Sequence, residues 1–590
     1  MAFGRRPSTD IGTAALHILL LILFLVLLGT GLRIASDDPD ALWLTVFDPI
    51  LPMEHLWYWH LVSGAALAAC LGAYVVYVTR AALTARIRFD SARLHAIWRG
   101  GRPRLAAINV AAVWLLLGSL LAEIVTGAML FWGAGESILS LHLWATWLCL
   151  ACIALHVAMH AAYGGVDQAL RIFRPSRLRA GSAPPDLAEL LAEQLRHRRS
   201  SDQPSPPMPD PSAIDGGANS LQSHPLASGL VIAALVAGAA LGAEDLTRPV
   251  LPIRAIAHGD APTIDGELSD PVWAKATTVS VMTTQGGDFG GSHQSRVEIR
   301  ALHDDKFAYF AFVWEDPTRS LKHLPLVKDR DGWRIASTDE NLVDESVYNE
   351  DKFAVLLSPG GLPLIGAAIH LASRPIAGRP PASSGRGLHY TLDGSILDVW
   401  QWRASHGGRT GYIDNCHIGA PGAGHAAQYT GGFGLDPGPK AYQPNFVGDP
   451  TPTSATRVHP RRLPKDPAAM REAMGRLTDA TNESESEGAR WWMTVSESVP
   501  YSSAADAAIP VGTVMPGVIV EEATKSGASD VRGFGRWAAG RWTLELMRRL
   551  QTGSSFDVDI KDGVLMWVAA FDHAEKRHTH HLRPVRLHLK

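Results

Sequence analysis

Five apolar runs in the first 243 residues constrain the fold of this chain more than any other feature. They cover residues 11–33, 56–79, 105–132, 139–163 and 226–243. An α-helix needs roughly 20 apolar residues to cross the hydrocarbon core of a bilayer, and these runs approach or exceed that length. The sequence therefore predicts a multidomain membrane protein whose N-terminal part is embedded in lipid.

The distribution of arginine predicts the direction of the spans. Arginines cluster before the first run, between the second and third, and after the fourth, whereas residues 34–55 hold five acids and no Lys or Arg. Because Lys and Arg mark the cytoplasmic side, we expect a cytoplasmic N-terminus and a periplasmic region 244–590 in a bacterial inner membrane. The fifth run also resembles a signal-peptide core, with Ala240, Leu241 and Gly242 before a cleavage point.

Composition divides the chain into four parts. We expect a transmembrane four-helix domain over 1–180, a cytoplasmic linker over 181–225, a fifth transmembrane helix over 226–243 and a periplasmic domain over 250–590. Much of the linker is rich in Pro, Ser and Gly, a composition typical of flexible segments. A short amphipathic helix at the membrane surface is expected just before that stretch, over 184–199.

Four histidines lie inside the apolar runs of the first domain. His142 and His156 are 14 residues apart on the fourth run, which is about 21 Å and close to four helical turns, so both rings face one side. The alternating direction of the runs places His60 at the depth of His142, and His17 at the depth of His156. Metal-binding side chains in lipid are functional by default. Two His pairs at two depths predict two b-type haems stacked across the bilayer.

Other residues of these runs leave alternatives open. His55 lies nearer a loop and His160 nearer the far surface, so we favour His60 and His156 as ligands. Glu123 could face a haem propionate, a proton path or a quinone pocket, or be a hydrogen-bonded acid at a helix contact. Four glycines would allow a porphyrin to approach the helices closely: Gly29, Gly31, Gly64 and Gly127.

The segments ALHILLLILFLVLLGTGL, WHLVSGAAL, EIVTGAMLFWG and LHLWATWLCLACIALHVAMH resemble the di-haem cytochrome b subunit of membrane-bound formate dehydrogenases and nickel–iron hydrogenases. The resemblance covers about residues 10–175. It implies electron exchange between a quinone and a partner redox protein, and it assigns the haem ligands to His17, His60, His142 and His156.

Several functions are disfavoured by what the sequence lacks. The net charge of −4 gives no reason to expect nucleic acid as a partner. The four cysteines suggest no disulfide framework, and Cys149 and Cys152 are interpreted as packing residues of a helix. No C-x-x-C-H sequence occurs, so covalently attached c-type haem is not expected. No nucleotide-binding glycine motif, molybdenum-site signature or iron–sulfur cysteine cluster indicates independent substrate chemistry.

The region after residue 250 has the character of a β-protein. Residues 297–303 and 307–315 are strand-like runs separated by Asp304, Asp305 and Lys306, which predicts a hairpin. Further runs lie at 352–357, 396–402, 541–547 and 564–571. We therefore expect an antiparallel β-sandwich with long irregular loops. Residues 405–490 hold few strand signals, and we expect a large loop there.

Blocks such as IDGELSDPVWAKA, VEIRALHDDKFAYFAFVWEDPTRS, DVWQWRAS and GRWTLELMRRL resemble the haem-binding subunit of ethylbenzene dehydrogenase, across about 255–590. The resemblance implies a b-type haem in a β-sandwich with methionine and lysine as axial ligands. The segment before DVWQW offers His389 rather than a methionine, and the place of a C-x-x-C-H in some relatives keeps only His370. For a third haem we predict one ligand from His370 or His389 and one from His578.

Further donors in this region are His580, His581, Met282 and Met515. The two histidines lie in a polar segment and could simply be solvated. The two methionines are additional sulfur ligand candidates for the third haem.

Three functions remain open. The favoured one is a membrane b-type cytochrome that transfers electrons between the quinone pool and a periplasmic redox partner through two haems or three. The second is a periplasmic carbohydrate-binding module on a redox-sensing membrane anchor, in which Trp491 and Trp492 could stack on a sugar, although both fit a protein core equally well. The third is work with an unseen dehydrogenase subunit that carries out the substrate chemistry.

Overall fold

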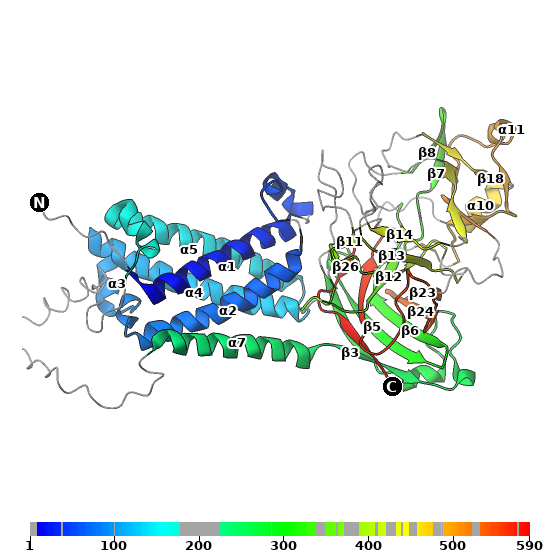
Figure 1. Cartoon of the computed structure of the whole chain (residues 1–590). Helices are drawn as coiled ribbons and strands as arrows, with labels where there is room; N and C mark the ends of the chain where they lie inside the picture. Colours follow the sequence, from blue (N-terminus) through cyan, green and yellow to red (C-terminus); the bar gives the residue numbers. More distant parts are fainter. Residues whose placement is uncertain are drawn as a thin grey trace, which may run out of the picture.

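The fold consists of a helical bundle and a β-rich domain placed end to end, as the computed structural model shows (Figure 1). The helix α7 runs along one side of the bundle and leads into the first strand of the β-domain. The structure describes residues 9–36, 39–52, 54–98, 101–176, 224–284, 286–336, 348–361, 364–367, 369–370, 389–406, 411–420, 432–437, 441–447, 457–475, 485–486, 488–521, 531–574 and 577–590. The expected linker and its amphipathic helix lie almost wholly outside these residues.

Five helices of the described chain are long and apolar enough to cross a membrane. They are α1 (Ile11–Ala35), α2 (Leu56–Arg80), α4 (Arg102–Phe131), α5 (Glu136–Ala169) and α7 (Pro225–Thr247). Each coincides with one of the five predicted apolar runs. The short helix α3 (Ser91–Ile97) lies between α2 and α4, at the end of the bundle away from the β-domain (Figure 1).

Small residues and one buried acid hold the helices together. Gly72 of α2 approaches Ile232 of α7 so closely that an added Cβ would lie 3.4 Å from it. Asp10 caps α1 by accepting the backbone N–H of Thr13 at 2.8 Å. The same carboxylate accepts the Tyr77 hydroxyl at 2.5 Å and the Arg86 guanidinium at 2.8 Å. Asp10 therefore fastens the start of α1 to the end of α2 and the following loop.

The β-domain is a sandwich whose main sheet has 13 strands. One layer contains β4 (Val279–Thr284), β5 (Gln294–His303), β6 (Phe307–Glu315), β24 (Arg541–Arg549) and β23 (Val531–Ala538). The other contains β26 (Thr579–His580), β25 (Leu565–Phe571), β9 (Lys352–Ser358), β12 (Leu397–Arg403), β13 (Asp414–Ile418) and β14 (Phe433–Leu435). The layers are joined through β26 and β4, and through β27 (Val585–Leu589) and β3 (Val250–Ala255).

Aromatic side chains from both layers form the core of the sandwich. Trp314 of β6 stacks on Phe353 of β9 with ring centroids 4.5 Å apart, and it meets Trp402 of β12 at 5.9 Å. Phe310 lies 5.7 Å from Trp400 across the same gap. These strands belong to opposite layers, so the predicted antiparallel sandwich is confirmed. All its ladders are antiparallel except those that join β3 to β27 and to β5.

The predicted hairpin is present, with β5 paired antiparallel to β6. Asp304 in its turn accepts the backbone N–H groups of Lys306 and Phe307 at 2.7 and 2.6 Å. It also accepts the hydroxyl of Tyr309 at 2.9 Å, which ties the turn to the strand that follows.

A second, smaller sheet packs around its own core of Leu326, Trp333, Phe446 and Met515. Its strands are β7 (Leu326–Asp329), β8 (Gly332–Ile335), β16 (Phe446–Val447), β17 (Arg457–Pro460) and β21 (Val514–Met515). A separate three-stranded sheet of β15 (Tyr442–Pro444), β22 (Val518–Val520) and β19 (Trp492–Thr494) contributes Met493 and Ile519 to the core of the sandwich. Nearby lie β18 (Arg462–Pro464), β20 (Ser498–Pro500), α10 (Pro467–Met474) and α11 (Ser503–Ala507).

The expectation of a large loop over 405–490 is therefore wrong. Six strands, from β13 to β18, and the helix α10 fall within that range. All six of these strands have only two to five residues. Such short strands are stabilised by pairing with distant segments, and they give too little hydrophobic periodicity to be read from sequence.

The β-domain is attached to the end of the bundle where α4 ends and α5 begins. Arg583 donates to the Glu244 carbonyl at 2.9 Å and to the Thr247 hydroxyl at 3.1 Å, both at the end of α7. Trp132 donates to the same hydroxyl at 3.0 Å. The backbone N–H of Glu136, the first residue of α5, lies 3.4 Å from the Gln294 side-chain oxygen of β5. These contacts place the first strands of the sandwich against the start of α5.

Replacement of Arg548 by alanine tests a buried ion pair in the sandwich. Its guanidinium lies 2.7 Å from Asp398 and 3.3 Å from Asp557, and all three side chains are at most 1% exposed. Leaving these carboxylates unpaired should lower the free energy of unfolding by about 3–5 kcal/mol, measured by denaturant titration with tryptophan fluorescence. Arg541→Ala on the same strand is the control. Its partner Glu315 is half-exposed, so a loss of no more than about 1 kcal/mol is expected.

Candidate functional site

The structure brings His60 of α2 and His142 of α5 together at the end of the bundle nearest the β-domain. Their ring centroids are 6.4 Å apart and their planes are inclined by 73°. Two metal–imidazole bonds of about 2 Å each, extended by the two ring radii, separate centroids by about 6 Å. The spacing therefore fits one metal ion held between the two rings.

Hydrogen bonds on the far side of each ring fix which nitrogen faces the partner. The Thr30 hydroxyl donates to the Val26 carbonyl at 2.7 Å, so it accepts from Nδ1 of His60 at 2.9 Å. The Thr126 hydroxyl donates to the Ala122 carbonyl at 2.7 Å and lies 2.8 Å from Nδ1 of His142. A proton on Nδ1 leaves the Nε2 lone pair free to bind a metal.

A Thr-Gly pair recurs on α1 and α4. Each glycine follows its threonine directly and lies under the corresponding imidazole. A Cβ added at Gly31 would be 3.3 Å from the His60 ring, and one added at Gly127 would be 3.4 Å from the His142 ring. The sequence analysis singled out both glycines but missed Thr30 and Thr126. The repeated dipeptide, in GTG and VTG, is the signal that could have identified them.

The second pair is His17 of α1 and His156 of α5, nearer the other end of the bundle. Their ring centroids are 6.5 Å apart with planes inclined by 30°. Nδ1 of His156 is buried and has no hydrogen-bond partner among the described residues. His160, the competing candidate, stands edge-on to His156 with centroids 4.7 Å apart, which is too close for a metal ion between them. The donor set and spacing of this pair fit a second haem.

Glu123 takes part in the contact between α4 and α5. One of its oxygens accepts the Thr146 hydroxyl at 2.7 Å, and the other lies 2.9 Å from Nδ1 of His142. Of the alternatives left open by the sequence, this geometry favours a hydrogen-bonded acid at a helix contact. The acid helps to orient the His142 ring.

The predicted donors of the β-domain lie on two different elements. His370 is on β10 (Ile369–His370) and is opposite Tyr390 of β11 (Tyr390–Thr391), directly after His389. The side chain of His370 lies outside the described residues. His578 instead packs on Phe571 at the end of β25, with ring centroids 4.7 Å apart.

His578 has other potential ligands as neighbours. The His580 ring is 6.1 Å from it, and Met282 projects from the same outer face of the sheet, two residues before the partner of His580. Buried Lys352 places its Nζ 5.7 Å from the Phe571 ring on which His578 packs. Burial and the neighbouring His578 lower the pKa of His580 to about 3, so this imidazole is neutral at pH 7 and suited to bind a metal.

Two further sequence candidates are structural. Both ring nitrogens of His581 are engaged, Nδ1 with the Arg583 carbonyl at 2.7 Å and Nε2 with the Val568 backbone N–H at 3.0 Å. Met515 is fully buried in the second core. Neither residue has a free donor atom directed toward the His578 region.

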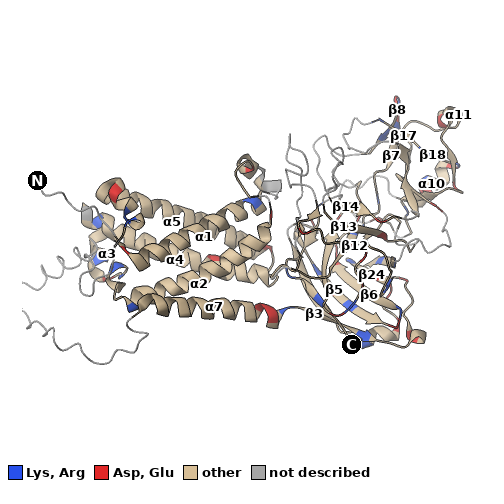
Figure 2. Cartoon of the chain, viewed as in Figure 1, with Lys and Arg blue, Asp and Glu red and all other residues tan. Residues whose placement is uncertain are grey.

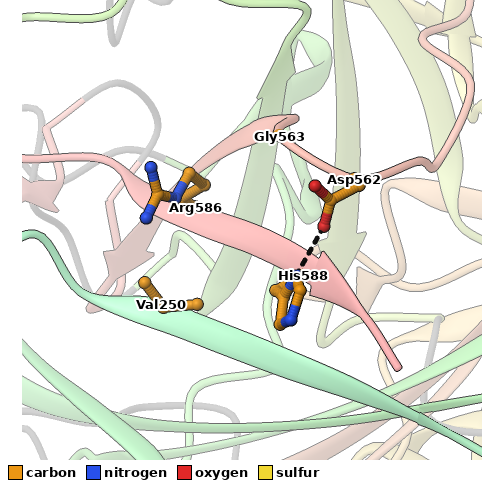
Figure 3. A pocket seen from close by; sticks show the side chains of 5 residues that line it. All are labelled: Val250, Asp562, Gly563, Arg586 and His588. Atoms are coloured by element: carbon orange, nitrogen blue, oxygen red, sulfur yellow. Dashed lines mark hydrogen bonds and ion pairs between the residues drawn. The ribbon is translucent and has the colours of Figure 1, made fainter.

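Neither of the two tryptophans expected to bind a sugar presents an open ring face at the surface. Trp491 is only 1% exposed and belongs to the sandwich core, so it cannot stack on a sugar. Trp492 is half-buried beneath the Arg490 guanidinium, 4.8 Å from its ring. A surface pocket of about 410 Å³ is lined by Val250, Asp562, Gly563, Arg586 and His588 (Figure 3). It contains none of the predicted site residues.

Both the β-domain and the helical bundle match known protein families. Residues 270–583, more than half of the chain, match the ethylbenzene dehydrogenase family. The chain belongs to this family. Residues 8–175, which contain both His pairs of the bundle, match the prokaryotic cytochrome b561 family. The two resemblances predicted from sequence are thereby confirmed, and the cytochrome b561 match supports membrane b-type cytochrome electron transfer.

Solved structures similar to this member of the ethylbenzene dehydrogenase family include a candidate carbohydrate-binding protein of Bacteroides uniformis. It is 8% identical, the match covers 58% of this chain and 100% of that one, and the TM-score is 0.23. A family 9 carbohydrate-binding module of Caldicellulosiruptor kristjanssonii with cellotriose is 9% identical, covering 57% and 93%, with a TM-score of 0.18. These scores are too low to support an inference. No curated protein matches the chain.

Replacement of Gly127 by valine tests the close approach beneath His142. The new methyl groups would press on a ring that a Cβ alone would already touch at 3.4 Å, and such overpacking costs about 1–3 kcal/mol. We expect the purified protein to lose the haem of this pair, measured as haem per chain. Gly118→Val on the same helix is the control, because no atom lies within 4 Å of its added Cβ. Equal haem content in the two variants would contradict the assignment.

Proposed function

We propose that this protein is a membrane-bound b-type cytochrome that carries electrons between the quinone pool and a periplasmic redox partner. The observation that carries the proposal is the presence of two histidine pairs at two levels of one bundle, with ring centroids 6.4 and 6.5 Å apart. Each pair would hold one haem b, which supplies one-electron chemistry when bound.

The residues of the bundle set the character of both sites. With two imidazoles per metal no coordination position stays open, which favours electron transfer over chemistry on a small ligand. Thr30 and Thr126 keep the Nδ1 protons in place, and a Glu123 oxygen lies 2.9 Å from Nδ1 of His142. A carboxylate next to a ligating imidazole raises the basicity of the ligand. The two sites should therefore differ in reduction potential.

The charge distribution supports a cytoplasmic position for the α3 end of the bundle. The ribbon at that end is coloured at several Lys and Arg positions (Figure 2), and the residues between α2 and α4 include Arg86, Arg88 and Arg93. By the rule that positive charge stays inside, we propose that the N-terminus is cytoplasmic and that the β-domain lies in the periplasm. His60 and His142 are then near the periplasmic surface.

A third haem is proposed on the outer face of the sandwich sheet. His580 lies opposite Thr284, which lies opposite Gln294, so the three residues form one row across neighbouring strands, about 10 Å long. Gln294 contacts Glu136, and His142 is about 9 Å further along α5. His578 and His580, with Met282 and Lys352 on the same face, are the donors we propose, and His370 and His389 remain candidates.

A periplasmic dehydrogenase subunit is the partner that best fits this arrangement. The predicted donors of the β-domain would form the outer end of a chain of redox sites whose inner members lie in the bundle. This protein would bind and orient the redox groups, and the partner subunit would carry out the substrate chemistry. The carbohydrate-binding alternative is not favoured, because the tryptophan proposed to stack on a sugar is buried in the core.

Alanine replacement of ligands from different pairs tests the membrane sites. His142→Ala and His156→Ala should each cost one haem per chain, and the double variant should lose both, because each change removes one of two axial bonds. The measurement is the pyridine haemochrome assay on purified protein, together with reduction by an added quinol. His55→Ala and His160→Ala serve as controls and should keep both haems. A double variant with the same haem content per chain as the unaltered protein would refute the proposal.

The third site has its own test. His578→Ala should lower the haem content by one per chain relative to the full-length protein, because an axial donor is lost. His588→Ala is the control, since this half-exposed imidazole pairs with Asp562 at 2.6 Å on another edge of the sandwich. If the unaltered chain holds only the membrane haems, the outer site is wrong and the membrane proposal still stands.

A further inference from the structure

Three fully buried aspartates meet at one end of the β-sandwich. Asp316 directly follows β6 in one layer, whereas Asp351 directly precedes β9 and Asp572 directly follows β25 in the other. Lys352 and Phe571 are paired across β9 and β25, which places the two latter aspartates side by side. All three have 0% exposure. Three carboxylates removed from water at one point are costly unless an opposite charge accompanies them.

Asp351 is oriented by donors from both layers. Its Oδ1 accepts the backbone N–H of His573 at 2.9 Å. Its Oδ2 accepts the backbone N–H of Ser320 at 2.7 Å and the indole N–H of Trp542 at 3.1 Å. These bonds fix the carboxylate but bring no full positive charge to it.

Asp572 is held in a similar way. Its Oδ2 accepts the backbone N–H of Phe289 at 2.6 Å, and its Oδ1 accepts the Thr318 hydroxyl at 3.2 Å. The same Oδ1 lies 2.5 Å from Nδ1 of His573. Ligand atoms of Asp351, Asp572 and His573 all lie within 4.8 Å of one another, the spacing of groups that share one ion. Asp316 lies outside this group and is linked to it through Thr318, whose backbone N–H donates to Asp316 at 3.1 Å and whose hydroxyl donates to Asp572 at 3.2 Å.

Asp316 supplies an independent sign of a missing ligand. Its Oδ1 accepts the Thr318 backbone N–H at 3.1 Å, but its Oδ2 is buried and has no hydrogen-bond partner among the described residues. Burial and the nearby Asp351 and Asp572 raise the pKa of this carboxyl well above its usual range. A buried carboxylate oxygen with no donor is costly, so natural structures rarely leave one without a partner.

We propose that Asp351 and Asp572, with Asp316 as a third carboxylate beside them, bind a divalent cation of the calcium class that joins the two layers of the sandwich. The three carboxylates supply oxygen ligands, which calcium prefers. Magnesium usually retains several waters and takes only one or two carboxylates, so a dry site with three suits it less well. Zinc prefers imidazole and thiolate donors, and the one imidazole here already has its Nδ1 directed at Asp572.

Such a cation would also order the segments around His578. Asp572 begins the segment that leads to His578 and accepts the backbone N–H of Phe289 in the loop before β5. A Cβ added at Gly286 in that loop would lie 2.2 Å from the His578 carbonyl oxygen. The cation site therefore supports the packing of the loop against the His578 segment, independently of whether a haem binds there.

The full-length protein in detergent provides the test. We expect one calcium ion per chain by elemental analysis when the protein is purified without chelator. Treatment with EGTA should lower the melting temperature of the β-domain, followed by tryptophan fluorescence, and calcium at a hundredfold excess over its Kd should restore about 5 °C. Tb³⁺ should replace calcium and give luminescence sensitised by Trp542, whose indole donates to Asp351.

The variant Asp316→Asn distinguishes two explanations of the buried aspartates, a cation site and a cluster of protonated acids. In EGTA the variant should melt higher than the unaltered protein, because one buried charge is gone. In calcium the variant should melt at a lower temperature than the unaltered protein. It should also lose at least about tenfold in calcium affinity, because a charged carboxylate ligand is replaced by a neutral amide. Asp329→Asn replaces a half-buried carboxylate that is paired with Arg457, and this control should behave as the unaltered protein in both conditions.

The proposal is overturned if the unaltered chain carries no stoichiometric metal and its melting temperature does not respond to calcium. It is also overturned if Asp316→Asn and Asp329→Asn respond equally to calcium. Should Asp316→Asn fail to fold, the metal content and the Tb³⁺ luminescence of the unaltered protein decide the question alone.

Discussion

The helices of the bundle pack so that each imidazole of the pair nearest the β-domain has a hydrogen-bond partner for its Nδ1 nitrogen. A ring nitrogen that must offer its lone pair to a metal needs its other nitrogen protonated and hydrogen-bonded, because no water is present to satisfy it. Thr30 and Thr126 meet this requirement from the neighbouring helices, and the glycine after each leaves room for the ring. The packing of α1 against α2 and of α4 against α5 thus serves the same two imidazoles that we propose as ligands of the haem nearest the β-domain.

The β-domain extends this arrangement beyond the membrane helices. Its attachment through Arg583 and Gln294 places the first strands of the sandwich at the start of α5, a short distance from His142. Electron transfer requires that redox groups lie close and stay in place. A rigid sandwich whose layers interlock through Trp314, Phe353 and Trp402 is suited to that task, and the buried aspartates would fasten the same layers at one end.

Much of the candidate site could be predicted because its signals are local. The spans follow from apolar length, and the His pairs follow from a 14-residue spacing on one helix and from matched depth on the others. What the sequence missed depends on neighbours distant in the chain. Thr30 is identified as a partner only when α1 packs on α2, and Trp491 is identified as a core residue only by its place in the buried cluster of the sandwich. The short strands between 405 and 490 form by pairing with remote segments, so their own residues carry little signal.

The sequence alone determined the membrane helices, the change to β-structure after residue 250 and the identity of the four membrane histidines, because each depends on residue type repeated at short range. Only the tertiary structure decided which nitrogen each ring of the pair nearest the β-domain presents, how the sandwich meets the bundle and which three aspartates share one buried point. Asp316, Asp351 and Asp572 are as much as 256 residues apart in the chain. Their proximity arises from the folding of one layer over the other, which no local pattern encodes.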